Sequence, residues 1–305
     1  MAKFVVAGIT QIETIVKVEQ IPVEFQLVTA MPDSIHMSAG GDAYNESLAL
    51  TWLGNDVTFC SIVGKNFDMN FINPPDRQIT LRTDYIMREM EDTPLEVILY
   101  DKNRKQQIFE DIKNLRDMPY DMDRARTIID ESDMVVLANA NFCRPFVEEA
   151  KKMNKSIAVN IRNFRREKEK YNTDFLGSAE VLYFGDDSLE EDPFDFVKSI
   201  AATYGTKIIV LGQGAEGLIL YDRDADIIAH YNTVKTNEVV NTAGAGNALI
   251  SCFLHYYMKD GDSVAAIKNA LLFASYKIGY MGTSNGFMTT DQVEQWRNLI
   301  WRIRK

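Results

Sequence analysis

The sequence lacks several features that mark specialised classes of protein. It has only three cysteines in 305 residues, at positions 60, 143 and 252. An odd number of widely spaced cysteines argues against a disulfide framework and for a reducing compartment, and no pair has metal-ligand spacing. No apolar run approaches the roughly 18 residues of a membrane span, and no signal peptide precedes the first apolar run. These absences predict a cytoplasmic protein with no membrane partner.

Positive charge is also scarce. The chain has 33 Lys and Arg against 44 Asp and Glu, a formal net charge of −11 at pH 7. A protein that binds a phosphate backbone needs a basic surface, so this balance argues against nucleic acid as the main partner. It does not argue against a small anion that is bound locally. The apolar content of 46% and charged content of 25% are ordinary for a globular protein.

Apolar runs of strand length alternate with segments of helical periodicity along most of the chain. Strands are predicted at residues 4–8, 57–63, 134–138, 157–160, 181–184 and 207–211. Helices are predicted at residues 42–53, 145–153 and 193–204, and helical patterns dominate from 245 to the end. This alternation is typical of a layered α/β fold with a mostly parallel sheet. We find no internal repeat or low-complexity linker, and we expect a single domain over residues 1–305.

Two segments interrupt the alternation. Residues 14–21 alternate on a period of two and end at Pro22. Residues 95–100 and 106–110 flank a polar turn that includes Arg104, and they predict a β-hairpin. We expect these pieces to form one small sheet, a lid inserted into the main domain and built from about residues 12–30 and 93–112.

The first glycine-rich segment follows a predicted strand. Gly212, Gly214 and Gly217 match the pattern G-x-G-x-x-G. A dinucleotide site would need a helix to begin at the last glycines, so that its N-terminus faces the pyrophosphate. Residues 218–221 and 227–231 instead predict a second hairpin. The sequence therefore disfavours a nicotinamide-dependent oxidoreductase, and a simple glycine turn is the alternative.

The second segment runs from Asn241 to Asn247 and contains Gly244, Ala245 and Gly246. It leads directly into a helical pattern that Gly261 ends. Small residues at a helix N-terminus let a ligand approach the exposed N–H groups, and the aligned peptide dipoles favour negative charge there. Glycines that only permit close helix packing are the alternative, which their clustering at the helix start disfavours.

The third segment contains Gly40 and Gly41 and opens a helix after an irregular stretch. Paired glycines allow a close approach to the backbone, and Asn45 supplies both hydrogen-bond donors and an acceptor. These residues alone leave a structural role and a ligand-binding role equally open.

In this order the three segments resemble the ribokinase family of carbohydrate kinases, the phosphofructokinase-B type, over nearly the whole chain. The family's N-terminal signature is matched by Gly40, Gly41, Asn45, Leu53 and Gly54. Its C-terminal D-T-x-G-A-G-D signature is matched by residues 241–247, and its nucleotide turn by Gly212, Gly214 and Gly217. The resemblance implies an α/β fold with a Rossmann-like, three-layer core, a mostly parallel sheet and a small β lid.

The resemblance also implies a reaction, in which the γ-phosphoryl group of ATP passes, with Mg²⁺, to a hydroxyl of a sugar or nucleoside. It places Gln11, Glu13, Gly40, Gly41 and Asn45 against the sugar. It places an anion hole at Gly244, Ala245 and Gly246, with Asn247 at the position of the base. It places the nucleotide against Gly212, Gly214, Gly217 and Thr242. Lid strands often form dimer interfaces in such enzymes and would otherwise leave an exposed edge, which favours a homodimer through the lid.

Several carboxylates of the family pattern are replaced. An amide, Asn247, stands at the base position, and amides also stand at two further aspartate positions, Asn241 and Asn160. The aspartate that binds the sugar hydroxyls in the family is replaced by the longer Glu13. The family's metal-associated segment is replaced near residues 185–188, so the metal ligands are unknown, although acidic residues lie close by at Asp186, Asp187 and Glu190.

Two functions stay open on these residues. An amide cannot take a proton from an alcohol, and general-base catalysis is worth ~10²–10⁴ in rate. Phosphoryl transfer depends mainly on positioning and charge stabilisation, so loss of the base would leave a slow sugar kinase. A neighbouring carboxylate such as Asp42 could also replace the missing base. The alternative is a non-catalytic sugar- or nucleotide-binding relative that acts as a sensor or regulatory subunit. The sequence does not name the acceptor.

Overall fold

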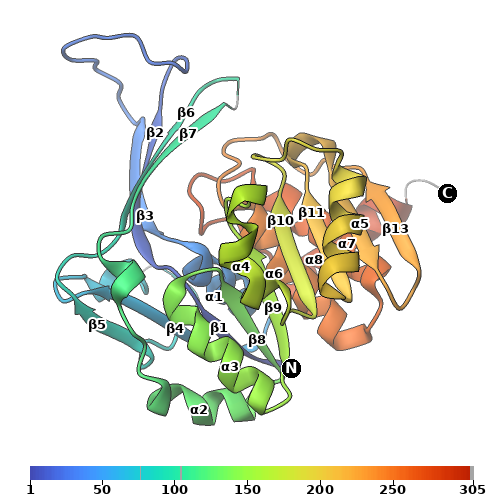
Figure 1. Cartoon of the computed structure of the whole chain (residues 1–305). Helices are drawn as coiled ribbons and strands as arrows, with labels where there is room; N and C mark the ends of the chain where they lie inside the picture. The colour runs from blue at the N-terminus through green and yellow to red at the C-terminus, as the bar shows by residue number, and fades with distance from the viewer. Residues whose placement is uncertain (76, 104, 303–305) are drawn as a thin grey trace.

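The computed structural model of the chain describes residues 1–75, 77–103 and 105–302, and its core is one large twisted sheet (Figure 1). The strand order is β13-β12-β11-β10-β9-β8-β1-β4-β5. The strands are Lys3–Ala7 (β1), Asp56–Gly64 (β4), Ile86–Met90 (β5), Met134–Ala138 (β8), Ser156–Ile161 (β9), Val181–Gly185 (β10), Ile208–Gly212 (β11), Leu218–Asp222 (β12) and Ile227–Tyr231 (β13). Neighbours from β5 to β11 are parallel, and β12 and β13 are antiparallel. The predicted mostly parallel α/β fold is confirmed.

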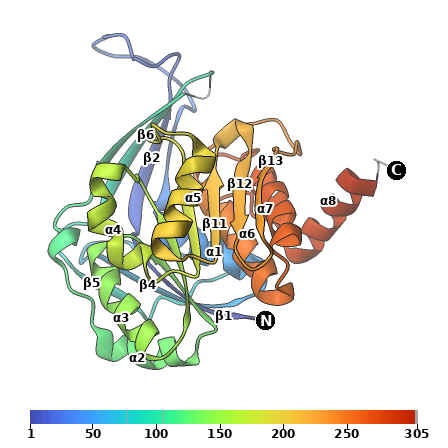
Figure 2. The ribbon, with the colours of Figure 1, turned by 45° about the vertical axis from the view of Figure 1, so that its right-hand side comes forward.

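Helices cover both faces of this sheet (Figure 2). One face carries Asp42–Trp52 (α1), Ala245–Asp260 (α6), Ser263–Lys277 (α7) and Thr290–Arg302 (α8). The other carries Met122–Glu131 (α2), Arg144–Lys152 (α3), Glu169–Leu176 (α4) and Pro193–Tyr204 (α5). The central strand β1 shows why two layers are needed. Phe4 and Val6 are buried in one apolar cluster and Val5 in the other, because successive side chains point to opposite faces.

A second sheet of four strands, in the order β3-β2-β6-β7, forms the lid. Its strands are Gln11–Lys17 (β2), Ile35–Gly40 (β3), Leu95–Tyr100 (β6) and Gln106–Asp111 (β7). Strands β2 and β6 are parallel and the other neighbours are antiparallel. In Figure 1 this sheet rises from the core and ends in the long connection between β2 and β3.

The lid corrects two expectations. The strand predicted at residues 14–21 begins three residues earlier and ends at Lys17. Strand β3 was not predicted, because its apolar Ile35 and Met37 are exposed while His36 and Ser38 are partly covered, so it lacks an apolar inner face. The hairpin of β6 and β7 is present, and its predicted turn residue Arg104 lies outside the described residues. The division of the chain into one domain with an inserted lid stays a prediction.

The carboxyl ends of the parallel strands meet at one edge of the large sheet, and the lid lies above that edge. Helix α1 begins there after Gly41, and α6 begins there after Gly244. In open α/β sheets, ligands bind outside the carboxyl ends of the strands. No helix in the described part of the chain is both long enough and apolar enough to cross a bilayer.

Candidate active site

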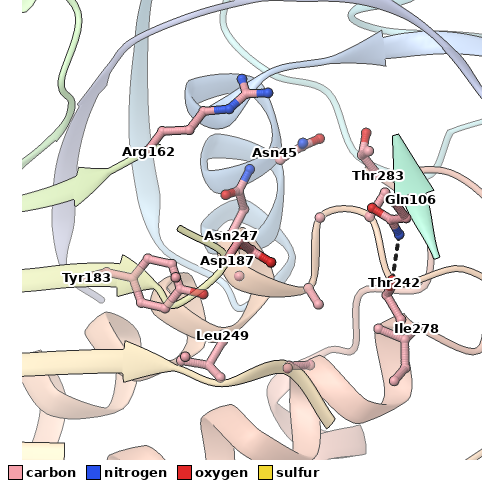
Figure 3. Close-up of a pocket in the computed structure, with 18 of the residues that line it drawn as sticks. Asn45, Gln106, Arg162, Tyr183, Asp187, Thr242, Asn247, Leu249, Ile278 and Thr283 are labelled. Carbon is pink, nitrogen blue, oxygen red and sulfur yellow. Dashed lines mark hydrogen bonds between the residues drawn. The ribbon is translucent and has the colours of Figure 1, made fainter. Parts of the chain in front are cut away.

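A cavity of about 1270 Å³ lies between the lid and the carboxyl edge of the large sheet (Figure 3). Its walls come from both sheets. The lid contributes Glu13, Glu96, Ile98, Gln106, Ile108 and Glu110, and the core contributes the ends of β9, β10 and β11 and the start of α6. Pockets for one small ligand measure roughly 300–1,000 Å³, so this cavity has room for two ligands side by side.

The start of α6 presents unpaired main-chain N–H groups to this cavity. The N–H groups of Gly244, Gly246 and Asn247 have no partner among the described residues, whereas the N–H of Ala245 donates to the carbonyl of Thr242 at 3.2 Å. The anion hole stays a prediction, and of its three residues Gly244 and Gly246 have an N–H without a partner in the described chain while Ala245 does not. We call the N–H groups of Gly244, Gly246 and Asn247 the cradle. With the positive end of the helix dipole behind them, these groups have the geometry and charge that suit an anion.

Glycine is required in the cradle for steric reasons. Gly244 has φ +78°, and a Cβ atom there would lie 2.5 Å from the carbonyl oxygen of Thr283. A Cβ at Gly246 would lie 2.5 Å from the hydroxyl of Tyr183, a side chain that the sequence did not single out. Tyr183 also packs against Gly212, so it separates the cradle from the glycine turn.

The base position is occupied by a hydrogen-bonded amide. The Nδ2 group of Asn160, at the end of β9, donates to Oδ1 of Asn247 at 3.2 Å and to Oε1 of Glu46 at 2.7 Å. Glu46 is fully buried on α1, and its burial, helped by the charge of Asp42, raises its pKa well above the usual range. Burial therefore favours the neutral form of Glu46, and Asn247 has no titratable oxygen.

Asp42 is a carboxylate on the cavity wall. It is the first residue of α1, where the helix dipole favours negative charge. It is 6% exposed and lines the cavity. Among the described residues the nearby side-chain hydrogen bonds run to Glu13 and Glu46, and none runs to the oxygens of Asp42. The guanidinium of Arg162 lies near Asp42, and the charge of Asp42 raises the pKa of Arg162. Asp42 thus keeps its oxygens free for a ligand.

Glu13 is held by the protein itself. Its Oε1 accepts from the N–H of Gly41 at 2.8 Å and from the side chain of Gln11 at 3.3 Å, and its Oε2 accepts from the hydroxyl of Thr283. Glu13 and Gly41 line the cavity, but Gln11 and Gly40 do not. Gly40 lies behind the carboxylate, where a Cβ would be 1.9 Å from its carbon. Gln11 and Gly40 do not line the cavity, and their contact with a sugar stays a prediction.

Polar contacts hold the lid against the core. Arg162, two residues beyond Asn160, forms an ion pair with Glu96 of β6 and a second with Glu110 of β7 at 3.2 Å. Gln106 of β7 donates to the hydroxyl of Thr242 at 2.6 Å (Figure 3). The sequence missed these lid residues because their partners lie far away in the chain. The sequence did contain one indication for Arg162, because this residue comes shortly after the predicted end of a strand at Asn160.

The burial of Glu96 predicts a pH dependence of stability. Burial raises the pKa of Glu96 from 4.5 to about 7, and the charge of Arg162 opposes this only in part. The folded protein therefore binds more protons than the unfolded chain between pH 4.5 and 7. This contribution to stability is complete below pH 4.5 and is lost as the pH rises through 7.

The shifted pKa of Glu96 makes the free energy of unfolding up to about 3 kcal/mol larger at pH 4.5 than at pH 8. Glu96→Gln should remove this part of the pH dependence. Urea unfolding of both proteins at these two pH values measures it. Glu91→Gln, at an exposed acid near the lid, is the control. An unchanged pH dependence in Glu96→Gln would contradict the assigned shift.

The other end of the cavity is lined by the glycine turn. Gly212 ends β11, and Gly214 and Gly217 lie in the tight turn that leads to β12. Apolar side chains that include Leu249 and Ile278 also line the cavity (Figure 3). The predicted hairpin of β12 and β13 follows the turn, so no helix begins there. Thr242 also lines the cavity, with its hydroxyl turned to the lid.

The pfkB family of carbohydrate kinases matches residues 1–291 of this chain. The chain belongs to that family. Deoxyribokinase of Salmonella typhi is 25% identical over 309 residues, which cover 96% of this chain and 98% of the relative. A microbiome-derived acarbose kinase has the same fold with a TM-score of 0.84 at 19% identity, over 96% of this chain and 98% of its own. Arabidopsis thaliana ribokinase matches with a TM-score of 0.79 at 16% identity, over 96% and 98%.

The resemblance to pfkB kinases implies Mg²⁺, and one pair of carboxylates fits such an ion. Asp186 and Asp187 follow the end of β10 and line the cavity, and Figure 3 shows Asp187 among its lining residues. Burial and the charge of Asp187 raise the pKa of Asp186, as expected for two adjacent acids. The described residues contain no group of three metal-ligating side chains. Magnesium is usually bound through one or two carboxylates with phosphates and water, so this pair fits an ion that arrives with a nucleotide.

Proposed function

We propose that this pfkB-family chain transfers the γ-phosphoryl group of ATP to a hydroxyl of a sugar, with a nucleoside as the second class of acceptor. The observation that carries the proposal is the cradle of unpaired N–H groups, which shares one cavity with the uncommitted carboxylate of Asp42. The relatives support it: one is a deoxyribokinase, and the Arabidopsis ribokinase structure is a complex with ribose and ATP.

Each part of the cavity has a role in this reaction. The nucleotide lies along the glycine turn of residues 212–217, with its terminal phosphate at the cradle. The acceptor lies under the lid against Asn45, whose Oδ1 is buried without a partner in the described chain and can accept from a sugar hydroxyl. Asp186 and Asp187 would hold Mg²⁺, which neutralises phosphate charge. The acceptor oxygen bonds to the γ-phosphorus as the bond to ADP breaks.

Asp42 is the proton acceptor in this proposal. The acceptor hydroxyl must lose its proton, Asn247 has no titratable oxygen, and burial favours the protonated form of Glu46. Both oxygens of Glu13 accept hydrogen bonds from the protein, and Glu96 is paired with Arg162. Asp42 remains as a carboxylate that lines the cavity and accepts no hydrogen bond from the described residues. Its role is to take the proton as the new oxygen–phosphorus bond forms.

Release of ADP over a panel of sugars and nucleosides, in a coupled assay with Mg²⁺, tests the proposal. We expect turnover with at least one acceptor, and Asp42→Asn is the matched control for contaminating kinases. A second function stays open because Oδ1 of Asn247 is occupied by Asn160. A non-catalytic binding protein would be stabilised by ATP and a sugar without releasing ADP. That result would end the enzymatic proposal.

We also propose that the outer face of the lid pairs with a second copy of the chain. Met37, Thr14, Val97 and Phe109 lie side by side across the four strands. Met37 is 57% exposed, Val97 36% and Phe109 52%. Apolar sheet faces of this kind are uncommon on monomers and are typical of interaction sites.

The double variant Val97→Lys and Phe109→Lys should be a monomer where the wild type is a dimer, because two lysines on each copy would face each other across the interface. Sedimentation velocity measures the mass of each protein. Leu299→Lys is the control, since Leu299 is 52% exposed on α8, far from the lid in both views (Figures 1 and 2). A monomeric wild type would rule out this interface.

A further inference from the structure

Lys277 is a fully buried lysine beside the cradle. It is the last residue of α7, and its side chain has no exposed surface. Its Nζ group donates one hydrogen bond to the carbonyl of Gly282 at 2.6 Å and another to the carbonyl of Ala243. Both acceptors are main-chain atoms, so the ammonium forms no ion pair within the described residues.

The two carbonyls belong to the two loops that shape the cradle. Ala243 directly precedes Gly244, the first residue of the cradle. Gly282 directly precedes Thr283, whose carbonyl lies against Gly244 and whose hydroxyl donates to Glu13. One ammonium therefore joins the end of α7, the cradle and the loop that reaches the acceptor side of the cavity.

Stability alone does not account for a lysine at this position. Taking an ammonium out of water is costly, and a well-packed apolar residue of similar volume is often equally or more stable. Burial lowers the pKa of Lys277 to about 7, and the negative charge of Glu13 opposes this shift. The charged form nevertheless makes two hydrogen bonds that an apolar side chain cannot make. Those bonds orient the two loops.

We infer that Lys277 is a positioning residue, whose ammonium holds the carbonyls of Ala243 and Gly282 so that the cradle N–H groups converge on the terminal phosphate of ATP. The inference rests on the proposed function, because it takes the cradle as the site of that phosphate. ADP lacks the phosphate that the cradle holds. A disturbed cradle should therefore weaken ATP binding more than ADP binding.

Calorimetric titration of Lys277→Met with ATP and with ADP, each with Mg²⁺, tests the inference. Hydrogen bonds to a charged group predict about a 10- to 100-fold loss of ATP affinity, with ADP affinity nearly unchanged. We expect kcat to fall by a similar factor while the KM of the acceptor stays the same. Lys268→Met, at an exposed lysine of the same helix, should match the wild type in both affinities. Lys277→Gln, which keeps a donor without the charge, replaces the methionine variant if that protein does not fold.

A small cation provides a second readout. In Lys277→Ala, ammonium chloride should restore ATP affinity, because the ion fits the vacated space and donates to both carbonyls. Tetramethylammonium chloride has the same charge but no N–H donors, and it should restore nothing. Equal responses to the two salts, or a parallel loss of ATP and ADP affinity, would overturn the inference and leave the proposed function standing. A wild type that binds neither nucleotide would overturn both.

Discussion

Asp42→Asn lowers kcat for phosphoryl transfer by roughly 10²–10⁴-fold, which is the usual contribution of a general base. The substitution removes the titratable oxygen and preserves the shape of the side chain. Because the oxygens of Asp42 accept no hydrogen bond from the described residues, the fold should be unaffected. Nucleotide affinity should also be unchanged, because the cradle and the glycine turn do not involve Asp42. Steady-state kinetics with the acceptor identified in the panel measure the effect.

Asn247→Asp in the Asp42→Asn background is the companion experiment. It places a carboxylate beside the cradle, where the pfkB pattern has its base and where Nδ2 of Asn160 lies 3.2 Å away. We expect this double variant to regain part of the lost rate. Asn247→Asp alone should change the rate little, because the wild type already has a proton acceptor. Full activity in Asp42→Asn would show that Asp42 is not that acceptor.

Gly244→Ala should lose at least about 10²-fold in kcat, the effect of removing one donor from an oxyanion-type site. Its φ of +78° is strained for any residue with a Cβ, at roughly 1–2 kcal/mol. The contact of 2.5 Å with the carbonyl of Thr283 forces one of the two loops to move, which adds about 1–3 kcal/mol. Unfolding in urea gives the stability change, and the coupled assay gives the rate.

Gly261→Ala is the matched control, because Gly261 ends the same helix. Its φ is +69°, and a Cβ there would meet nothing within 4 Å. The backbone strain is therefore similar, without the clash and far from the cavity. We expect a loss of about 1 kcal/mol in stability and full activity. If both variants kept full activity, the cradle would not be the site of the transferred phosphate.

Local patterns account for the parts of the molecule that were predicted well. Strand β8 has the bounds that its apolar run predicted, and α5 ends before Gly205, which has the left-handed conformation that favours glycine there. Sequence patterns did not predict strand β3, because this strand lacks a buried apolar face. They also did not show that Gln11 and Gly40 lie outside the cavity lining, since the alternation of a strand does not tell which residues reach a cavity and which lie behind them.

The order of strands and helices, the turns that need glycine and the helix start that can bind an anion were all readable in the sequence, because each depends on neighbours within a few residues. Tertiary structure alone decided which side chains complete the site. Glu46 and Asn160 are 114 positions apart, Arg162 and Glu96 are 66 apart, and Lys277 and Ala243 are 34 apart. Burial and hydrogen bonding between such distant residues determine which acid stays neutral and which keeps its oxygens free. No local pattern shows these contacts, because they arise only when segments distant in the chain pack against each other.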